Sequence, residues 1–163
     1  MSRKIDSLKN RKDSMNRSAA CIALIWLGMV LGISFLETPV KFMAPSVTLA
    51  IGLDIGRYVF GAFNKVECAF ALAMAILLMI IRKKDLSMIL LGLAWLFLAL
   101  QTVWLLPVLE ARVEVIIQGQ TPAPSMLHTI YVVLEVLKAF ALAAYGFWNV
   151  LITKTGSEKI TKG

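Results

Sequence analysis

Four long hydrophobic runs, separated by short stretches rich in charge or proline, dominate the pattern of the chain. They cover about residues 19–36, 58–81, 86–109 and 127–152. A helix needs roughly 17 to 25 apolar residues to cross the hydrocarbon core of a bilayer, so each run is long enough for one span. The pattern therefore predicts an all-α fold, an integral membrane four-helix bundle that forms a single domain over residues 1–163.

The connections between these runs carry further signals. In the first connection, Pro39 is expected to end the first helix, and Ser46 is expected to N-cap a short helix in the membrane interface. The third helix is expected to extend into water through Glu114 before the segment GQTPAP forms a loop. Outside the spans lie a basic arm, residues 1–18, and a basic tail, residues 153–163.

Composition and charge agree with a membrane protein and predict its orientation. Hydrophobic residues make up 59% and charged residues 17% of the chain, against about 45–50% and 25% in soluble domains. Twelve of the 17 lysines and arginines lie in the arm, in the connection at 82–85 and in the tail. Because basic flanking residues stay on the cytoplasmic side, we expect a multi-pass membrane protein with both termini cytoplasmic. The same rule explains the basic excess, so no nucleic acid partner is predicted. That the membrane is the bacterial inner (plasma) membrane is implied by the family resemblance described below.

Several ionisable residues lie inside the hydrophobic runs, where each charge costs about 2.5 to 3.5 kcal/mol at the bilayer centre. At about 1.5 Å of rise per residue, Glu67, Gln101 and Glu135 all lie about 12 to 13 Å below the outer ends of their runs. Lys138 lies about 4 to 5 Å deeper and follows Glu135 at a spacing that lets the two side chains pair on one helix. Three helices are thus expected to place polar groups at one level.

Helical angles arrange the polar residues in two stripes that are too costly to face lipid. At about 100° per residue, the stripe on the second helix contains Arg57, Asn64 and Glu67, while Lys65 lies off it. The stripe on the fourth helix contains His128, Tyr131, Glu135 and Lys138. We expect the stripes to face each other around an outward-facing polar cavity. The predicted ligand-binding residues are Glu37, Lys41, Arg57, Asn64, Glu67, Gln101, His128, Tyr131, Glu135 and Lys138.

The sequence offers little for catalysis or metal binding. His128 is the single histidine, and the chain lacks a CxxC pair, a phosphate-binding glycine-rich loop and a nucleophile elbow. Ser125, His128 and Glu135 could supply a serine, a base and an acid, but Ser125 belongs to a proline-rich loop. No catalytic residue, metal or cofactor is predicted.

Two resemblances accompany these patterns. The segments ALIWLGMVLGISFLETPVKF and VFGAFNKVE resemble a bacterial group of four-span membrane proteins related to the transmembrane protein 205 family. The residues that carry this resemblance are Trp26, Gly28, Phe35, Pro39, Val40, Phe42 and Glu67. It implies a four-helix integral membrane protein and brings no activity or catalytic residues. The pair Asn64 and Glu67 is also similar to the Asn-x-x-Glu of the membrane-associated eicosanoid and glutathione enzymes, although their arginine pattern is absent.

The leading functional prediction is a non-enzymatic membrane protein that binds, or helps transport, a small polar or amphiphilic ligand through the outward-facing cavity. A small membrane enzyme acting on a lipid or thiol substrate is one alternative, and an assembly subunit whose stripes bind partner membrane helices is another. The predicted partners are membrane lipids and the ligand, while a homo-oligomer and a partner membrane protein stay open. The polar stripes could also serve only as helix–helix contacts, which are worth about 0.6 to 2 kcal/mol each.

Overall fold

The computed structural model describes residues 2–82 and 85–161, and in these residues the regular secondary structure is entirely helical. Its elements are α1 (Ser2–Val30), the π-helix η1 (Leu31–Glu37), α2 (Thr38–Lys41), α3 (Leu49–Ile81), α4 (Ser87–Leu100), the π-helix η2 (Gln101–Leu105), α5 (Leu106–Ile117) and α6 (Leu127–Thr161). They join into four rods: the first is α1–η1–α2, the second α3, the third α4–η2–α5 and the fourth α6. All four rods are long and apolar enough to cross a membrane, so the all-α prediction is confirmed for the described chain.

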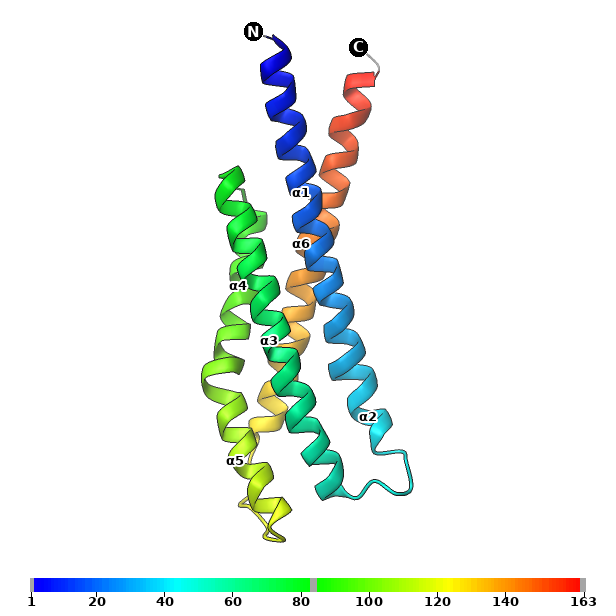
Figure 1. Cartoon of the computed structure of the whole chain (residues 1–163), viewed down its shortest axis with the longest axis vertical. Helices are drawn as coiled ribbons and strands as arrows, with labels where there is room; N and C mark the ends of the chain where they lie inside the picture. Colours follow the sequence, from blue (N-terminus) through cyan, green and yellow to red (C-terminus); the bar gives the residue numbers. More distant parts are fainter. Residues whose placement is uncertain (1, 83–84, 162–163) are drawn as a thin grey trace.

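The rods lie side by side and form a closed ring of contacts (Figure 1). α1 packs against α6 and α3, α6 packs against α4, and α3 packs against α5. The start of α1 and the end of α6 lie together, at what we call the terminal end of the molecule (Figure 1). The connections at residues 42–48 and 118–126 lie at the opposite end, which we call the loop end (Figure 1).

Apolar side chains both fill the interior and cover the outer surface of the bundle. Gly146 lets α6 approach α1, because a Cβ at this position would lie 2.6 Å from a methyl carbon of Leu24. Trp26 is fully buried in the interior. By contrast, the outer faces of the rods expose large apolar side chains such as Met79 at 77% and Phe140 at 70%. Apolar exposure on this scale is typical of a surface that faces lipid or a partner rather than water.

Each of the two π-helices stands directly before a proline. Pro39 lies near the start of α2 and Pro107 near the start of α5. Proline lacks an N–H group, and its ring clashes with the carbonyl four residues earlier in a regular α-helix. A wider turn can relieve that clash. The prediction that Pro39 ends the first helix was therefore wrong, because the rod continues through η1 to Lys41.

The predicted separate interfacial helix with Ser46 as N-cap was also wrong. Thr48 caps α3 instead, and its hydroxyl oxygen accepts a hydrogen bond from the backbone N–H of Ile51 at 3.3 Å. From Leu49 the helix runs without interruption to Ile81, since no proline lies between these residues. The extension of the third rod through Glu114 is confirmed, as α5 ends only at Ile117.

Candidate functional site

Lys138 is the centre of a group of buried polar side chains in the middle of the molecule. Its Nζ atom lies 2.5 Å from Glu67 Oε1 and 2.7 Å from Glu135 Oε2. The same atom donates a hydrogen bond to Gln101 Oε1 at 2.8 Å. The ammonium of Lys138 thus has two carboxylates and one amide oxygen as its nearest polar neighbours.

The carboxylates receive further donors from the other helices. Trp26 Nε1 donates to Glu67 Oε1 at 2.9 Å. Ser34 Oγ donates to Glu135 Oε1 at 3.0 Å, and the hydroxyl of Tyr131 donates to the same oxygen at 3.2 Å. All four rods therefore contribute to one group, which we call the buried charge cluster. It consists of Trp26, Ser34, Glu67, Gln101, Tyr131, Glu135 and Lys138.

Helical geometry explains how these side chains meet. Tyr131, Glu135 and Lys138 follow one another at spacings of four and three residues, which places them on one face of α6. Ser34 belongs to η1, and Gln101 is the first residue of η2. Both π-helices thus supply a side chain to the cluster. Single π-helical turns inside α-helices occur frequently at functional sites.

The cluster is sealed from the surroundings and unbalanced in charge. Glu67 and Glu135 are each 1% exposed, and Lys138 and Gln101 are fully buried. Two ionised carboxylates and one ammonium would sum to a formal charge of −1. The Nε2 group of Gln101 is buried without a hydrogen-bond partner among the described residues. Buried ion pairs offset their desolvation cost only when geometry and additional hydrogen bonds are good. Glu67 Oε1 and Glu135 Oε1 accept such bonds, whereas Glu135 Oε2 lies near Lys138 Nζ without a hydrogen-bond partner among the described residues.

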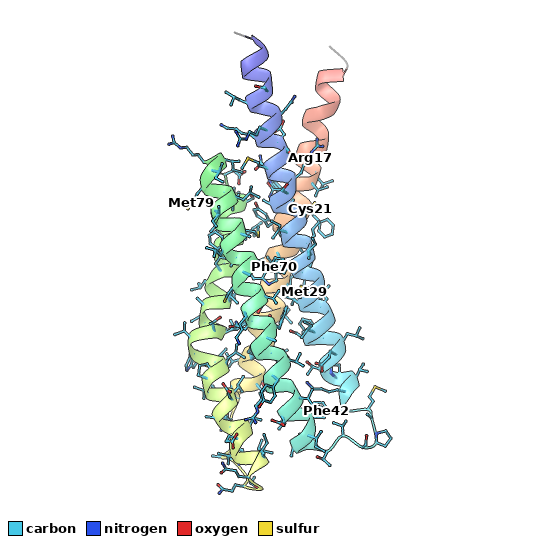
Figure 2. The ribbon with its side chains drawn as sticks, in the orientation of Figure 1. Arg17, Cys21, Met29, Phe42, Phe70 and Met79 are labelled. Carbon is cyan, nitrogen blue, oxygen red and sulfur yellow. The ribbon has the colours of Figure 1, made fainter. Side chains whose placement is uncertain are left out.

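A cavity of about 460 Å³ lies at the loop end, next to the cluster. This volume falls within the roughly 300 to 1,000 Å³ of small-molecule sites. Apolar residues such as Leu53, Leu106 and Val113 form most of its wall. All four rods contribute, through α2, the first half of α3, α5 and the first turns of α6. Figure 2 shows Phe42, one of the lining residues, at the loop end beside the start of α3.

Lys41 brings a positive charge to the wall of this cavity. Its Nζ atom lies 3.3 Å from Glu37 Oε2 and 5.7 Å from the ring centres of both Phe42 and Phe60. The side chain of Lys41 is only 11% exposed. An ammonium between two aromatic rings is stabilised by their negative faces. Lys41 therefore offers N–H donors in largely apolar surroundings.

The remaining lining cations are held by partners at the rim. Arg57 pairs with Asp54 and Glu114, both at 2.7 Å, and the two carboxylates are about half exposed. Arg112 Nη2 donates to the carbonyl oxygen of Ala123 at 2.5 Å, which links α5 to the second loop. These contacts join helices and loops around the mouth of the cavity.

Two glycines of α3 make room for this arrangement. A Cβ at Gly52 would lie 2.1 Å from the ring of Phe42, and one at Gly56 would lie 3.1 Å from Lys41 Nζ. Any larger residue at Gly52 would displace the aromatic ring. Sequence reasoning missed both glycines, although their small-xxx-small spacing is a known signal of close helix approach.

The structure places eight of the ten predicted site residues in two separate places, the cavity and the cluster. The cavity is lined by Lys41, Arg57, His128 and Tyr131. The cluster contains Glu67, Gln101, Tyr131, Glu135 and Lys138. Glu37 pairs with Lys41 at the rim, and Asn64 Nδ2 donates to Thr102 Oγ1 at 2.8 Å, away from both places. The prediction of one polar cavity was therefore wrong, because the acids turn inward to Lys138 and leave a mainly apolar cavity.

Several residues of the cavity and of the buried charge cluster were not predicted from the sequence. Trp26 was not among the predicted site residues, yet its N–H group donates to Glu67. Ser34 was a small polar residue within a hydrophobic run, a signal that could have been used. Phe60 stands edge-on to Tyr131, with ring centres 5.6 Å apart, and both line the cavity. Tyr131 thus belongs to the cavity and to the cluster.

Four helices of this length and composition indicate a multi-pass membrane protein. No family model, curated protein or solved structure matches the chain. The resemblance to the group related to the transmembrane protein 205 family stays a prediction, and the function has to be argued from the geometry.

Proposed function

We propose that the protein is a non-enzymatic integral membrane protein that binds, or helps transport, a small amphiphilic ligand in the loop-end cavity. The observation that carries this proposal is a cavity of about 460 Å³ with apolar walls and one largely buried ammonium, that of Lys41. The apolar part of the ligand lies along the walls, and its polar group meets Lys41. Pockets with mostly apolar lining and few polar groups are the usual form of small-molecule sites.

The distribution of basic residues supports an outward-facing cavity. The arm at 1–18 and the tail at 153–163 are basic, as is the connection at 82–85. The cavity lies at the loop end, opposite the terminal end that carries the arm and the tail (Figure 1). Under the positive-inside rule the termini are cytoplasmic in a bacterial plasma membrane, and the cavity opens to the outside.

The cost of the buried charge cluster supports a functional site over mere helix contacts. Neutral hydrogen bonds between helices are sufficient for cohesion, and this chain has one between Asn64 and Thr102 at 2.8 Å. Three ionisable groups at the bilayer centre cost far more than such a pair and are typical of functional positions. The cluster is also closed within one chain, with Glu67 and Glu135 only 1% exposed, which argues against its binding partner helices.

A cavity-filling variant tests the proposal. Gly61 lines the cavity, and a Cβ there would meet nothing within 4 Å, so Gly61→Leu can fill space without a clash. Gly92 on α4 also has open space around its Cβ position but does not line the cavity, so Gly92→Leu is the matched control. The probe is a dansyl-labelled alkyl sulfonate, added to purified protein in phosphatidylcholine nanodiscs.

We expect the wild-type protein to bind the probe saturably and Gly61→Leu to bind it at least about tenfold more weakly, a loss of about 1.4 kcal/mol. Gly92→Leu should bind like the wild type. A Lys41→Gln variant should lose affinity for the sulfonate but retain affinity for the neutral alcohol with the same chain and label. Equal binding by the two glycine variants would show that the cavity is not the site.

A further inference from the structure

The buried charge cluster holds two carboxylates and a single ammonium, which leaves one negative charge without a counter-charge. Lys138 Nζ contacts both Glu67 and Glu135, so the two carboxylates share one ammonium. An uncompensated charge is the most costly state of a group that is removed from water. One added proton makes the cluster neutral without any change of packing.

The polar side chains that belong to the cluster can be named for the described part of the chain. The titratable ones are Glu67 on α3 and Tyr131, Glu135 and Lys138 on α6. The others, which do not titrate, are Trp26 on α1, Ser34 on η1 and Gln101 on η2. Any proton that the cluster takes up is therefore held by the two glutamates.

Tyr131 connects these glutamates to the cavity. The residue lines the cavity, and its hydroxyl donates to Glu135 Oε1 at 3.2 Å. Phe60 lies between Tyr131 and Lys41, the residue that is proposed to meet the polar group of the ligand. The Phe60 ring centre is 5.6 Å from that of Tyr131 and 5.7 Å from Lys41 Nζ. A ligand held at Lys41 is thus connected to the cluster through two contacts, that of Lys41 with Phe60 and that of Phe60 with Tyr131.

From this arrangement we infer that the buried charge cluster binds one proton, exchanges it with the loop-end cavity through the Tyr131 hydroxyl, and couples its protonation to the binding of an anionic amphiphile. The coupling rests on the proposed function, whereas the proton site does not. In the exchange, a hydronium ion in the cavity gives a proton to the phenol oxygen while the phenol proton moves to Glu135 Oε1. Water, a neutral Tyr131 and a carboxylic acid remain.

The coupling has a definite sign. An anionic headgroup at Lys41 repels the negative form of the cluster and favours the protonated form, so binding takes up a proton. By linkage, affinity for the anion rises as the pH falls, by up to about tenfold per pH unit when one proton is coupled. A neutral headgroup has no such repulsion, and its affinity does not follow the pH.

The first measurement concerns the proton site and needs no ligand. Infrared spectra of the protein in nanodiscs are recorded during a pH titration, and the C=O stretching band of a protonated carboxylic acid is followed. We expect this band in the wild type above about pH 6, where ordinary carboxyl groups are ionised, and its loss in the same range in both Glu67→Gln and Glu135→Gln. Each of these variants keeps one glutamate beside Lys138, a neutral pair that needs no proton. A wild-type protein without the band above about pH 6 would overturn the proton site.

The second measurement concerns the coupling. Calorimetric titration with the alkyl sulfonate, whose headgroup stays ionised, is repeated in buffers of different ionisation enthalpy to count protons. We expect an uptake that approaches one proton in the wild type, none in Glu135→Gln, and none for the alcohol analogue. Binding of the sulfonate without proton uptake would overturn the coupling and leave the proposed function intact. Absence of any binding would overturn the proposed function and the coupling, while the infrared band would still decide the proton site.

The third measurement separates a proton path from a structural role of the tyrosine. Tyr131→Phe keeps the ring contact with Phe60 and removes the hydroxyl that reaches Glu135. We expect an unchanged number of protons but proton uptake at least about tenfold slower in stopped-flow records with a pH indicator, because the relay hydroxyl is missing. Uptake at the wild-type rate would show that the proton takes another route. Tyr58→Phe is the control, since it also removes a tyrosine hydroxyl, but from a side chain that is 70% exposed and does not line the cavity.

Discussion

Replacement of Lys138 by methionine removes the ammonium and keeps most of the side-chain volume. Glu67 Oε1 and Glu135 Oε2 lie 2.5 and 2.7 Å from Lys138 Nζ, so removal of the ammonium leaves two buried carboxylates in close proximity. Two such charges about 5 Å apart repel by about 3 kcal/mol at an effective dielectric constant near 20. Removal of one partner from a buried ion pair typically costs about 3 to 5 kcal/mol. We expect Lys138→Met to lower the free energy of unfolding by about 3 to 5 kcal/mol near pH 7.

The loss should shrink as the pH falls. The two carboxylates of the folded variant can escape their repulsion by taking up a proton, whereas glutamates in the unfolded chain stay ionised above about pH 4.3. Protonation of one glutamate costs about 4 kcal/mol at pH 7 and about 1 kcal/mol at pH 5. Because the folded variant then binds more protons than the unfolded chain, its stability decreases as the pH rises.

Denaturant titration of the purified protein in mild detergent, followed by tryptophan fluorescence, measures these losses. Lys65→Met is the control, because Lys65 lies on the exposed face of α3 and should change stability little. The triple variant Lys138→Met with Glu67→Gln and Glu135→Gln carries no charge in the cluster and should be more stable than Lys138→Met alone. A triple variant as unstable as the sum of its single changes would refute the reasoning, since the three groups would not share one environment.

Two further predictions concern the indole contact and the topology. Trp26→Phe should cost about 1.5 to 3 kcal/mol in the same titration because it removes a hydrogen bond to the Glu67 carboxylate, whereas Trp95→Phe removes a buried N–H without a partner and should cost less. Equal costs would mean that the bond to Glu67 adds nothing. The topology is tested in whole cells with a variant from which the native cysteines have been removed. A cysteine at Thr121 should react with a membrane-impermeant maleimide, and one at Ser7 should not. The reverse pattern would contradict the orientation that the basic residues predict.

The buried charge cluster could be anticipated from the sequence because two simple constraints act on it. Charges within apolar runs are too costly to face lipid, and the helical repeat determines which residues share a face. The pairing of Glu135 with Lys138 follows from their spacing and is confirmed at 2.7 Å. The common depth of Glu67 with these residues is confirmed by its 2.5 Å contact with Lys138.

The cavity could not be anticipated in the same way. Angles on one helix do not say which neighbour a residue meets, so Asn64 was assigned to the cavity although it bonds to Thr102 on η2. The walls depend on where Gly52 and Gly56 let other side chains approach, which is a property of two helices together. The helix continues past Pro39 because of a local widening, the π-helix η1, and the hydrophobic pattern of the sequence does not predict this element.

That widening makes the length of the first rod as important as its composition. A π-turn accommodates one residue more than the α-helix that it interrupts, so the residues before and after it keep their faces of the rod. Deletion of a single residue within Leu31–Glu37 would therefore restore a plain α-helix and leave both Trp26 and Lys41 on their present faces, yet it would change the side chain that the rod presents to Glu135, where Ser34 now lies. In an alignment of related chains, a one-residue gap in this segment would mark proteins that keep the tryptophan contact and the wall of the cavity while contacting Glu135 differently.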